Sequence, residues 1–489
     1  MSGALTKWSD RCNPILVKDV RAALRGRSFP ITFVIVLTLA VCASLGYVSL
    51  ANLRGTENEG PGYFMMLAAC IGLSVHCIVP FGAMLGMNGE AEENTLEFLQ
   101  LSGIAGWRIV AGKLGSALLQ ALLMYSAFAP FVAFAFLLRG VPAETIFGLL
   151  LVSSATCMAQ CSVGIALGAI ARARWARVLL LIVFGFILLQ TGPMGIMMFA
   201  VVGASGMTAG ALPGALGLGL YTVVLVSLTA TIGFGTLGAV MLAHREENRS
   251  TPIRVATTFV FLVGCAFAAF APSRDVATVL LVITILCVAP AMFFVTTERE
   301  TLPRAVAAHL PGWARASSPL SAWLPGGARG VMFVLAHCAA LLAVHLVLSA
   351  LVFRTGALLD AEFMRLFATV LVLIVFLLLP SAVSAPFTAR AGGVGLARLA
   401  ILIFIAGALV APPILAFITR IDALSEWSIV SRPFDFQGGG SGKPGPWILL
   451  ATLVSLSLFA NLPRILQSIS ELRTARATPL EKAPERAVA

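Results

Sequence analysis

The chain has 489 residues, of which 59% are apolar and only 11% are charged. Because a soluble domain averages about 25% charged residues, this composition excludes an ordinary soluble protein and indicates a membrane protein. No polar stretch exceeds roughly 35 residues, which is less than the ~50 that a soluble domain needs. The net charge of +11 is distributed in a way that fits membrane topology and anionic lipid, and we expect no nucleic acid partner.

The first 28 residues are polar and basic, and we expect residues 1–28 to form a cytoplasmic N-terminus. Residues 13–27 predict a helix, with Asn13 as its N-cap and Pro14 at its first position. One face of this helix is apolar and the opposite face carries Lys18, Arg21 and Arg25. Such a helix is expected to lie in the membrane interface against lipid. A simple basic flank of the first span is the alternative.

Apolar segments follow along the rest of the chain, each of about 17–29 residues and long enough to cross a hydrocarbon core of roughly 30 Å. They lie at 29–50, 62–87, 114–138, 143–170, 176–201, 215–243, 255–271, 276–296, 331–353, 364–387, 395–419 and 447–466. The predicted fold class is therefore all-α, a polytopic membrane helix bundle of about 12 transmembrane helices. Residues 467–489 are predicted to form a disordered cytoplasmic tail.

The distribution of basic residues predicts the orientation. With the N-terminus inside, 25 of the 33 Lys and Arg residues fall in inside loops and termini. The positive-inside rule then places both termini in the cytoplasm. All Asp, Glu, Lys and Arg residues fall in loops or at span ends, whereas ion-coupled carriers usually keep such a residue at mid-membrane. A secondary transporter is therefore the weaker of the transport hypotheses.

The stretch from Met87 to Lys113 is unusual because four glutamates cluster between two spans: Glu90, Glu92, Glu93 and Glu97. Acidic side chains are costly in hydrocarbon, so we expect this loop to lie in water, on the cytoplasmic side. Residues 91–102 predict a short helix with apolar residues on two sides. Two apolar edges would suit a helix held between its own bundle and a second protein, although an ordinary linker helix is the alternative.

The order of these features resembles the permease subunit of ABC-2 type transporters. The matching residues are Glu93, Thr95, Leu96, Glu97, Leu99, Leu101, Ser102, Ile109, Gly112 and Lys113, with Asn94 and Gly103 departing from the family pattern. The resemblance covers residues 13–243 well and the rest poorly. It implies a bacterial inner (plasma) membrane permease whose 91–102 coupling helix docks on a separate ABC ATPase subunit, present in two copies. The coupling residues it implies are Glu92, Glu93, Thr95, Leu96, Glu97, Leu99 and Leu101.

A weaker echo of this pattern follows the eighth span. Glu298, Glu300, Thr301 and Leu302 precede Gly312-Trp313, at the spacing that separates Thr95 from Gly106-Trp107. Two six-span membrane halves, 29–243 and 244–466, would then each carry a coupling segment. Coincidence among common residues is the alternative, and in that case the protein would form a homodimer.

Other motifs do not indicate an enzyme. The Gly-Ser-Gly-Lys-Pro run at 440–444 lacks the residues of a phosphate-binding loop, so we expect ATP hydrolysis in a partner subunit. Isolated histidines, namely His76, His337 and His345, are expected to be hydrogen-bonded within the bundle. We expect no catalytic, cofactor or metal site. The remaining alternative to a transporter is a membrane assembly scaffold.

Overall fold

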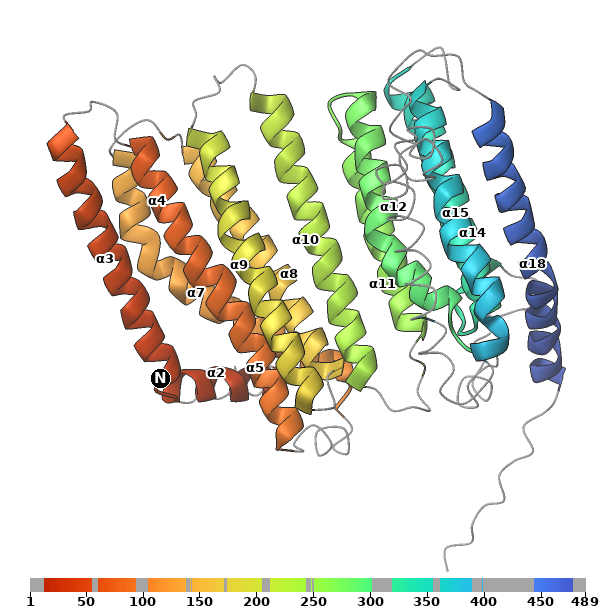
Figure 1. The fold of residues 1–489 in the computed structure, drawn as a ribbon, viewed down its shortest axis with the longest axis horizontal. Coiled ribbons are helices and arrows are strands. Elements are labelled where there is room, and N and C mark those ends of the chain that lie inside the picture. The colour runs from red at the N-terminus through yellow and green to blue at the C-terminus, as the bar shows by residue number, and fades with distance from the viewer. Residues whose placement is uncertain are drawn as a thin grey trace, which may run out of the picture. The chain divides into compact units, whose positions relative to one another are not determined.

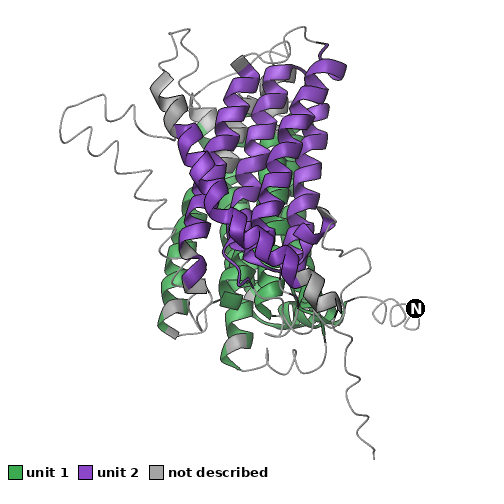
Figure 2. Cartoon of the chain, turned by 90° about the vertical axis from the view of Figure 1, so that its right-hand side faces the viewer, with its two compact units in different colours: residues 1–244 green, residues 245–489 purple. Residues whose placement is uncertain are grey.

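The structure is a computed structural model of the whole chain. It describes residues 13–54, 60–93, 104–137, 141, 143–170, 174–204, 212–242, 248, 250–300, 319–354, 361–388, 398 and 444–477. Within these ranges every regular element is a helix and no strand occurs. The chain divides into two compact units, residues 1–244 and 245–489, which Figure 2 shows in green and purple.

Unit 1 contains one short helix followed by long ones (Figure 1). Its elements are α2 (Pro14–Arg25), α3 (Ser28–Arg54), α4 (Gly60–Leu73), the π-helical turn η1 (Ser74–Ile78), α5 (Val79–Glu92), α7 (Gly106–Leu137), α8 (Ala143–Ile170), α9 (Arg174–Ala204) and α10 (Leu212–Leu242). Helices α4, η1 and α5 continue one another, so that a single long rod is interrupted only by the π turn.

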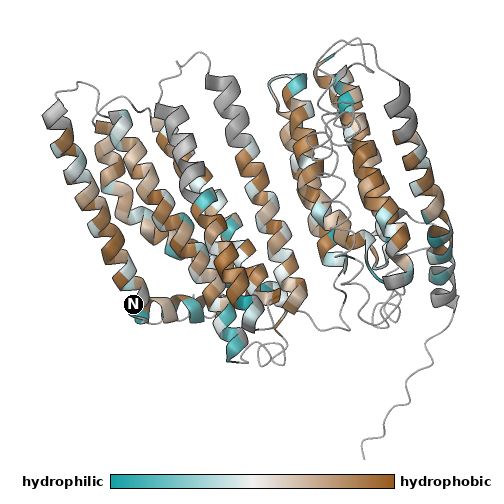
Figure 3. Ribbon diagram, in the orientation of Figure 1, coloured by the Kyte–Doolittle hydropathy of each residue, from teal (hydrophilic) through white to brown (hydrophobic). Residues whose placement is uncertain are grey.

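Unit 2 is also built from long helices. Its elements are α11 (Ser250–Ala269), α12 (Arg274–Thr296), the 3₁₀ turn η2 (Pro319–Trp323), α14 (Gly327–Val347), the π-helical turn η3 (Leu348–Val352), α15 (Ala361–Thr388) and α18 (Pro444–Ala477). The hydropathy colouring shows mostly hydrophobic residues along the middle of these helices and of those in unit 1 (Figure 3).

Ten helices in the described residues are long and apolar enough to cross a membrane. The all-helical fold class is confirmed for these residues, and the ten helices indicate a multi-pass membrane protein. Helix α9 occupies the place of the predicted span 176–201, and its apolar portion is Arg177–Thr191. The predicted span 395–419 lies outside the described residues apart from residue 398. The count of twelve and the repeat of six spans stay predictions.

The helices bury aromatic and aliphatic side chains within each unit and expose others around it. In unit 1, Tyr63, Phe64 and Leu67 are fully buried against α7 and its neighbours, whereas Ile182 is 66% exposed. Exposed apolar side chains of this kind are stable in contact with lipid hydrocarbon, whereas their exposure to water would be unfavourable. They therefore fit the membrane assignment.

Helix α2 lies crosswise to α3, at the end of unit 1 where α3 begins (Figure 1). Asn13 caps it as predicted, because its Oδ1 accepts a hydrogen bond from the Ile15 N–H at 3.0 Å. Its Nδ2 donates to the Arg108 carbonyl at 2.5 Å. A Cβ at Gly112 would lie 2.7 Å from the Ile15 Cβ, so glycine is what allows α2 to pack directly on α7. The predicted helix is confirmed; its position in a membrane interface stays a prediction.

The start of the C-terminal tail differs from the prediction. We expected disorder from residue 467, but α18 continues to Ala477. The reason is that Arg329 of α14 donates hydrogen bonds to the Ser468 carbonyl at 3.4 Å and to the Glu471 carboxylate at 2.8 Å. These contacts hold a polar segment in helical form. Residues 478–489 lie outside the described residues.

Candidate functional site

The predicted coupling segment joins the end of α5 to the start of α7. Glu92 is the last residue of α5, and Glu93 follows in a turn whose N–H donates to the Gly89 carbonyl at 3.0 Å. Both side chains are exposed. The other predicted coupling residues, Thr95, Leu96, Glu97, Leu99 and Leu101, lie outside the described residues.

A charged cluster lies beside this segment, and we call it the α2 clamp. It consists of Lys18 and Asp19 on α2, Glu90 on α5 and Lys113 on α7. The Glu90 carboxylate pairs with Lys18 Nζ at 2.8 Å and with Lys113 Nζ at 2.9 Å, and Lys113 Nζ also lies 3.5 Å from Asp19. The clamp therefore joins three helices that are far apart in the sequence.

The position of Glu90 differs from our expectation that all four glutamates lie in water. Glu90 belongs to α5 and its side chain is only 10% exposed. The physical reason is that two ammonium groups compensate the desolvation of its carboxylate. Lys113, whose side chain is 7% exposed, lies seven residues into α7, about 10 Å from its first residue.

Lys18 shows the electrostatic effect of the clamp. Its side chain is 52% exposed, and the hydrogen bond to the Glu90 carboxylate raises the pKa of Lys18 above its ordinary value. Partial burial acts in the opposite direction, and the charges of Glu90 and Asp19 add to the rise.

The other two predicted lipid contacts, Arg21 and Arg25, are exposed on α2. They are free of the clamp and available to an anionic surface.

A second ion pair fixes the end of α5 to α9. The Glu92 carboxylate lies 3.3 Å from the Arg177 guanidinium, whose side chain is 13% exposed. On the other side of the segment, Trp107 is 62% exposed at the start of α7 and the Arg108 guanidinium lies 5.4 Å from its ring centroid. Sequence reasoning noted Trp107 only for its spacing and missed this exposed aromatic–cation pair.

Asn88 is a polar side chain buried close to the same segment. It is 5% exposed and packs against Gly168 of α8, since a Cβ on Gly168 would lie 3.3 Å from Asn88 Oδ1. Neither Oδ1 nor Nδ2 has a hydrogen-bond partner among the described residues. An unsatisfied buried amide is costly. No sequence signal marked this residue.

In unit 2, the predicted second coupling residues that the structure describes are engaged inside the unit. The Glu298 carboxylate accepts from Ser250 Oγ at 2.7 Å, from the Arg254 guanidinium at 2.8 Å and from the Gly326 N–H at 3.2 Å. Arg254 is fully buried. Gly326 has φ +133°, a conformation that favours glycine.

Glu300 makes a comparable set of contacts. It accepts from the Ala328 N–H at 2.9 Å and from the Nε of Arg464 on α18 at 2.9 Å. Together, Glu298 and Glu300 connect the end of α12 with the starts of α11 and α14 and with the interior of α18. Thr301 and Leu302 lie outside the described residues. A contact between this segment and a partner stays a prediction.

The histidines are placed inside the units. His76 and His337 are hydrogen-bonded, with His337 Nδ1 2.8 Å from the Phe333 carbonyl, and His345 is buried beside Phe363. Among the described residues, no group of three or more His, Cys, Asp or Glu residues is placed to hold a metal ion. The site therefore consists of charged side chains and exposed loop ends.

Comparison with protein-family models, with curated proteins and with solved structures found no match to this chain.

Proposed function

We propose that this chain is the membrane-spanning permease subunit of an ATP-driven ABC transporter, acting as an exporter in a bacterial inner membrane. A separate ABC ATPase would dock on residues 91–102, on the cytoplasmic side that also holds both termini. The resemblance to ABC-2 permeases and the charge distribution of the sequence support this proposal. The second of two ATPase copies would bind either to a second copy of the chain or to the segment around Glu298.

The observation that carries the proposal is the way in which both ends of the 94–103 segment are tied to other helices. Before it, Glu90 and Glu92 bind α2, α7 and α9. After it, the Arg108 carbonyl is bound by Asn13 of α2. A partner that moved this segment would therefore displace four helices of unit 1 together. Contiguous networks of ion pairs and hydrogen bonds of this kind can carry conformational coupling between sites.

The partner would bind the exposed polar and aromatic side chains around the segment. Glu93 and Trp107 are exposed on its two sides. Exposed aromatic side chains beside charges are typical anchors of protein interfaces. Glu90 is excluded as a contact, because its carboxylate is already taken up within unit 1.

The first test is whether a reading frame next to this gene encodes an ABC ATPase, and repeated absence of one would count against the proposal. The second test is ATP turnover by such an ATPase, measured with the purified permease in lipid vesicles. We expect the two proteins to copurify and the permease to stimulate turnover. Glu93→Arg with Glu97→Arg, or Leu101→Asp, should abolish the stimulation while insertion and yield stay normal. Glu144→Arg is the matched control, because Glu144 is an exposed glutamate at the start of α8. Normal stimulation in the 93/97 and 101 variants would refute the proposal.

A secondary transporter is the second candidate, and one observation favours it. His76 is a titratable side chain, 1% exposed, inside the span Pro61–Glu90. Intramembrane ionisable residues often serve proton-coupled transport. Uptake or efflux that follows an imposed pH gradient without any ATPase, and that is lost in His76→Gln, would favour this candidate.

A further inference from the structure

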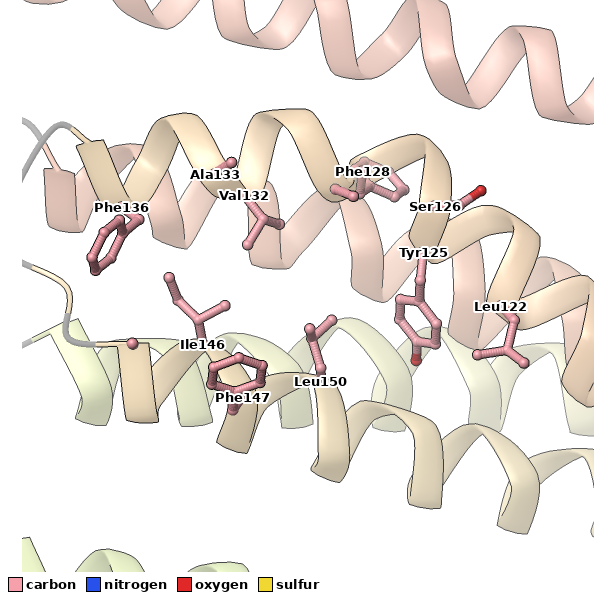
Figure 4. A pocket seen from close by; sticks show the side chains of 12 residues that line it. Leu122, Tyr125, Ser126, Phe128, Val132, Ala133, Phe136, Ile146, Phe147 and Leu150 are labelled. Atoms are coloured by element: carbon pink, nitrogen blue, oxygen red, sulfur yellow. The ribbon is translucent and has the colours of Figure 1, made fainter.

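A cavity of about 570 Å³ lies between α7 and α8 in unit 1 (Figure 4). Its volume falls in the range of small-molecule sites, about 300–1,000 Å³. Both helices are long and apolar enough to cross a membrane. Along α7 the cavity extends from Leu122 to Phe136, a distance of about 21 Å at 1.5 Å per residue. It is therefore elongated along the direction of the spans.

The walls of the cavity are almost entirely apolar. Val132 and Phe136 of α7 face Ile146, Phe147 and Leu150 of α8 across it (Figure 4). Phe136 and Phe147 are 51% and 71% exposed, so the cavity opens to the surroundings of unit 1 and not into its core.

The two hydroxyl groups in the lining are already used within the protein. Ser126 Oγ donates to the Leu123 carbonyl of its own helix at 2.7 Å. Tyr125 projects from α7 toward α8, and its hydroxyl lies 2.7 Å from Ser153 Oγ (Figure 4). The Ser126 hydroxyl proton is therefore already used within the protein, the Tyr125 hydroxyl is already paired with Ser153, and an acyl chain needs no hydrogen bond from the lining.

Tyr125 is also the first member of a chain of hydrogen bonds that reaches three other elements and is exposed only at its last bond, to Thr191. Ser153 Oγ lies 2.8 Å from His76 Nε2, and His76 Nδ1 lies 2.8 Å from Gln160 Oε1. Gln160 Nε2 donates to Thr191 Oγ1 of α9 at 3.3 Å. We call this chain the polar relay.

A neutral His76 with its proton on Nδ1 would donate to Gln160 Oε1 and accept from Ser153 Oγ at Nε2, and Ser153 would then accept from the Tyr125 O–H. In this arrangement the donors of the polar relay run in one direction. His76 lies in the π-helical turn η1, and such turns are frequent at functional sites. A displacement of the Tyr125 ring would break the first bond and alter the others.

We propose that the α7/α8 cavity binds one acyl chain of a membrane lipid, and that Tyr125 links its occupancy to the polar relay. The elongated shape, the carbon walls, the opening toward the membrane and the location within two spans all match an acyl chain lying parallel to the helices. The proposal is independent of the ATPase partner. Tyr125 is a positioning residue in it, since its ring contacts the chain and its hydroxyl contacts Ser153.

The first experiment uses the whole protein in nanodiscs of phosphatidylcholine that carries a photoactivatable diazirine on its acyl chain. Adducts mapped by mass spectrometry should be more abundant on the cavity residues of α7 and α8 than on exposed α9 residues such as Ile182. Filling the cavity with Ala133→Phe, or with Ala129→Leu as a second variant, should lower cavity labelling by about tenfold, the equivalent of losing two buried CH₂ groups. Leu119→Phe is the control, because Leu119 is exposed on α7 but does not line the cavity.

Labelling spread evenly over α7, α8 and α9, or unchanged by both filling variants, would overturn the proposal. So would efficient Phe147→Cys cross-linking between two chains, which would assign the cavity to a second copy. The relay is tested by the imidazole ¹⁵N signals of His76. They should differ between lipid-depleted and lipid-loaded protein, and in Tyr125→Phe the difference should disappear while labelling persists. Identical His76 signals in both states of the wild type would refute the link to the relay.

Discussion

Removal of the Glu90 carboxylate is the most direct perturbation of the α2 clamp. In Glu90→Ala, Lys113 keeps a side chain that is 7% exposed and retains only Asp19, at 3.5 Å. Breaking a buried ion pair by removing one partner costs about 3–5 kcal/mol. The half-exposed Lys18 adds less than about 1 kcal/mol. Because Asp19 remains, we expect the lower end, about 3 kcal/mol.

This loss is measurable as thermal unfolding of the purified protein in detergent at pH 7. At about 2–4 °C per kcal/mol for a unit of this size, the melting temperature should fall by about 6–12 °C. Glu93→Ala is the control, since Glu93 is exposed at the adjacent turn and should change stability by less than about 0.5 kcal/mol.

A double variant separates the ion pair from the packing around it. Glu90→Leu with Lys113→Met removes both buried charges and should recover most of the lost stability, because a buried pair can be replaced by apolar residues at little cost. If Glu90→Ala has the same melting temperature as Glu93→Ala, or if the double variant is no more stable than Glu90→Ala, the ion pairs of the α2 clamp do not stabilise unit 1.

Two further predictions concern the same end of unit 1. Asn88→Leu should raise the melting temperature by about 2–4 °C, since it removes an unsatisfied buried amide worth about 1 kcal/mol or more; a lower melting temperature would mean that the amide has a partner. Lys18→Arg should match the wild type at pH 9 and exceed it at pH 11. The raised pKa of Lys18 means that its contribution is complete below the unfolded value of about 10.4 and is lost as the pH rises through the folded value, whereas arginine stays charged. Equal melting curves for both proteins at pH 11 would show that the Lys18–Glu90 contact contributes nothing.

The sequence predicts the helices well where long apolar runs decide them. The span predicted at 143–170 coincides with α8, and the predicted helix at 13–27 forms with the expected cap. A run of about twenty apolar residues has no other stable arrangement in a membrane, so composition alone is sufficient there.

The prediction is least accurate where a charge lies inside a helix. We expected a span to begin at residue 114, but α7 begins at Gly106, and Lys113 is tolerated because Glu90 neutralises it. The same holds for α18, in which Arg329 of another helix holds Glu471. The partners are 23 and 142 residues away in the chain, respectively. Local patterns contain no information about such contacts.

The candidate site shows the same limit. Sequence reasoning identified the acidic stretch, but it treated its glutamates as one group. The structure separates them: Glu90 binds two lysines inside unit 1, Glu92 binds Arg177, and Glu93 is exposed. His76 was expected to be hydrogen-bonded, and its partners Ser153 and Gln160 come from another helix. Which residues face a partner protein therefore depends on tertiary contacts.

Glu298 tests whether the second acidic segment supports the fold or contacts a partner. Its carboxylate is the ion-pair partner of Arg254, which is fully buried, so Glu298→Gln leaves an uncompensated charge and should cost about 3–5 kcal/mol. Arg299→Glu changes the neighbouring residue, which is exposed, and should leave the melting temperature within about 1–2 °C of the wild type. A wild-type melting temperature for Glu298→Gln would refute the anchoring role. If that variant also failed to stimulate the ATPase, residues 298–302 would instead be a partner contact. A strong loss of stability would mean that Glu298 supports the fold of unit 2, so that charge reversal at Glu298 could not separate coupling from folding, whereas charge reversal at the exposed Glu93 can.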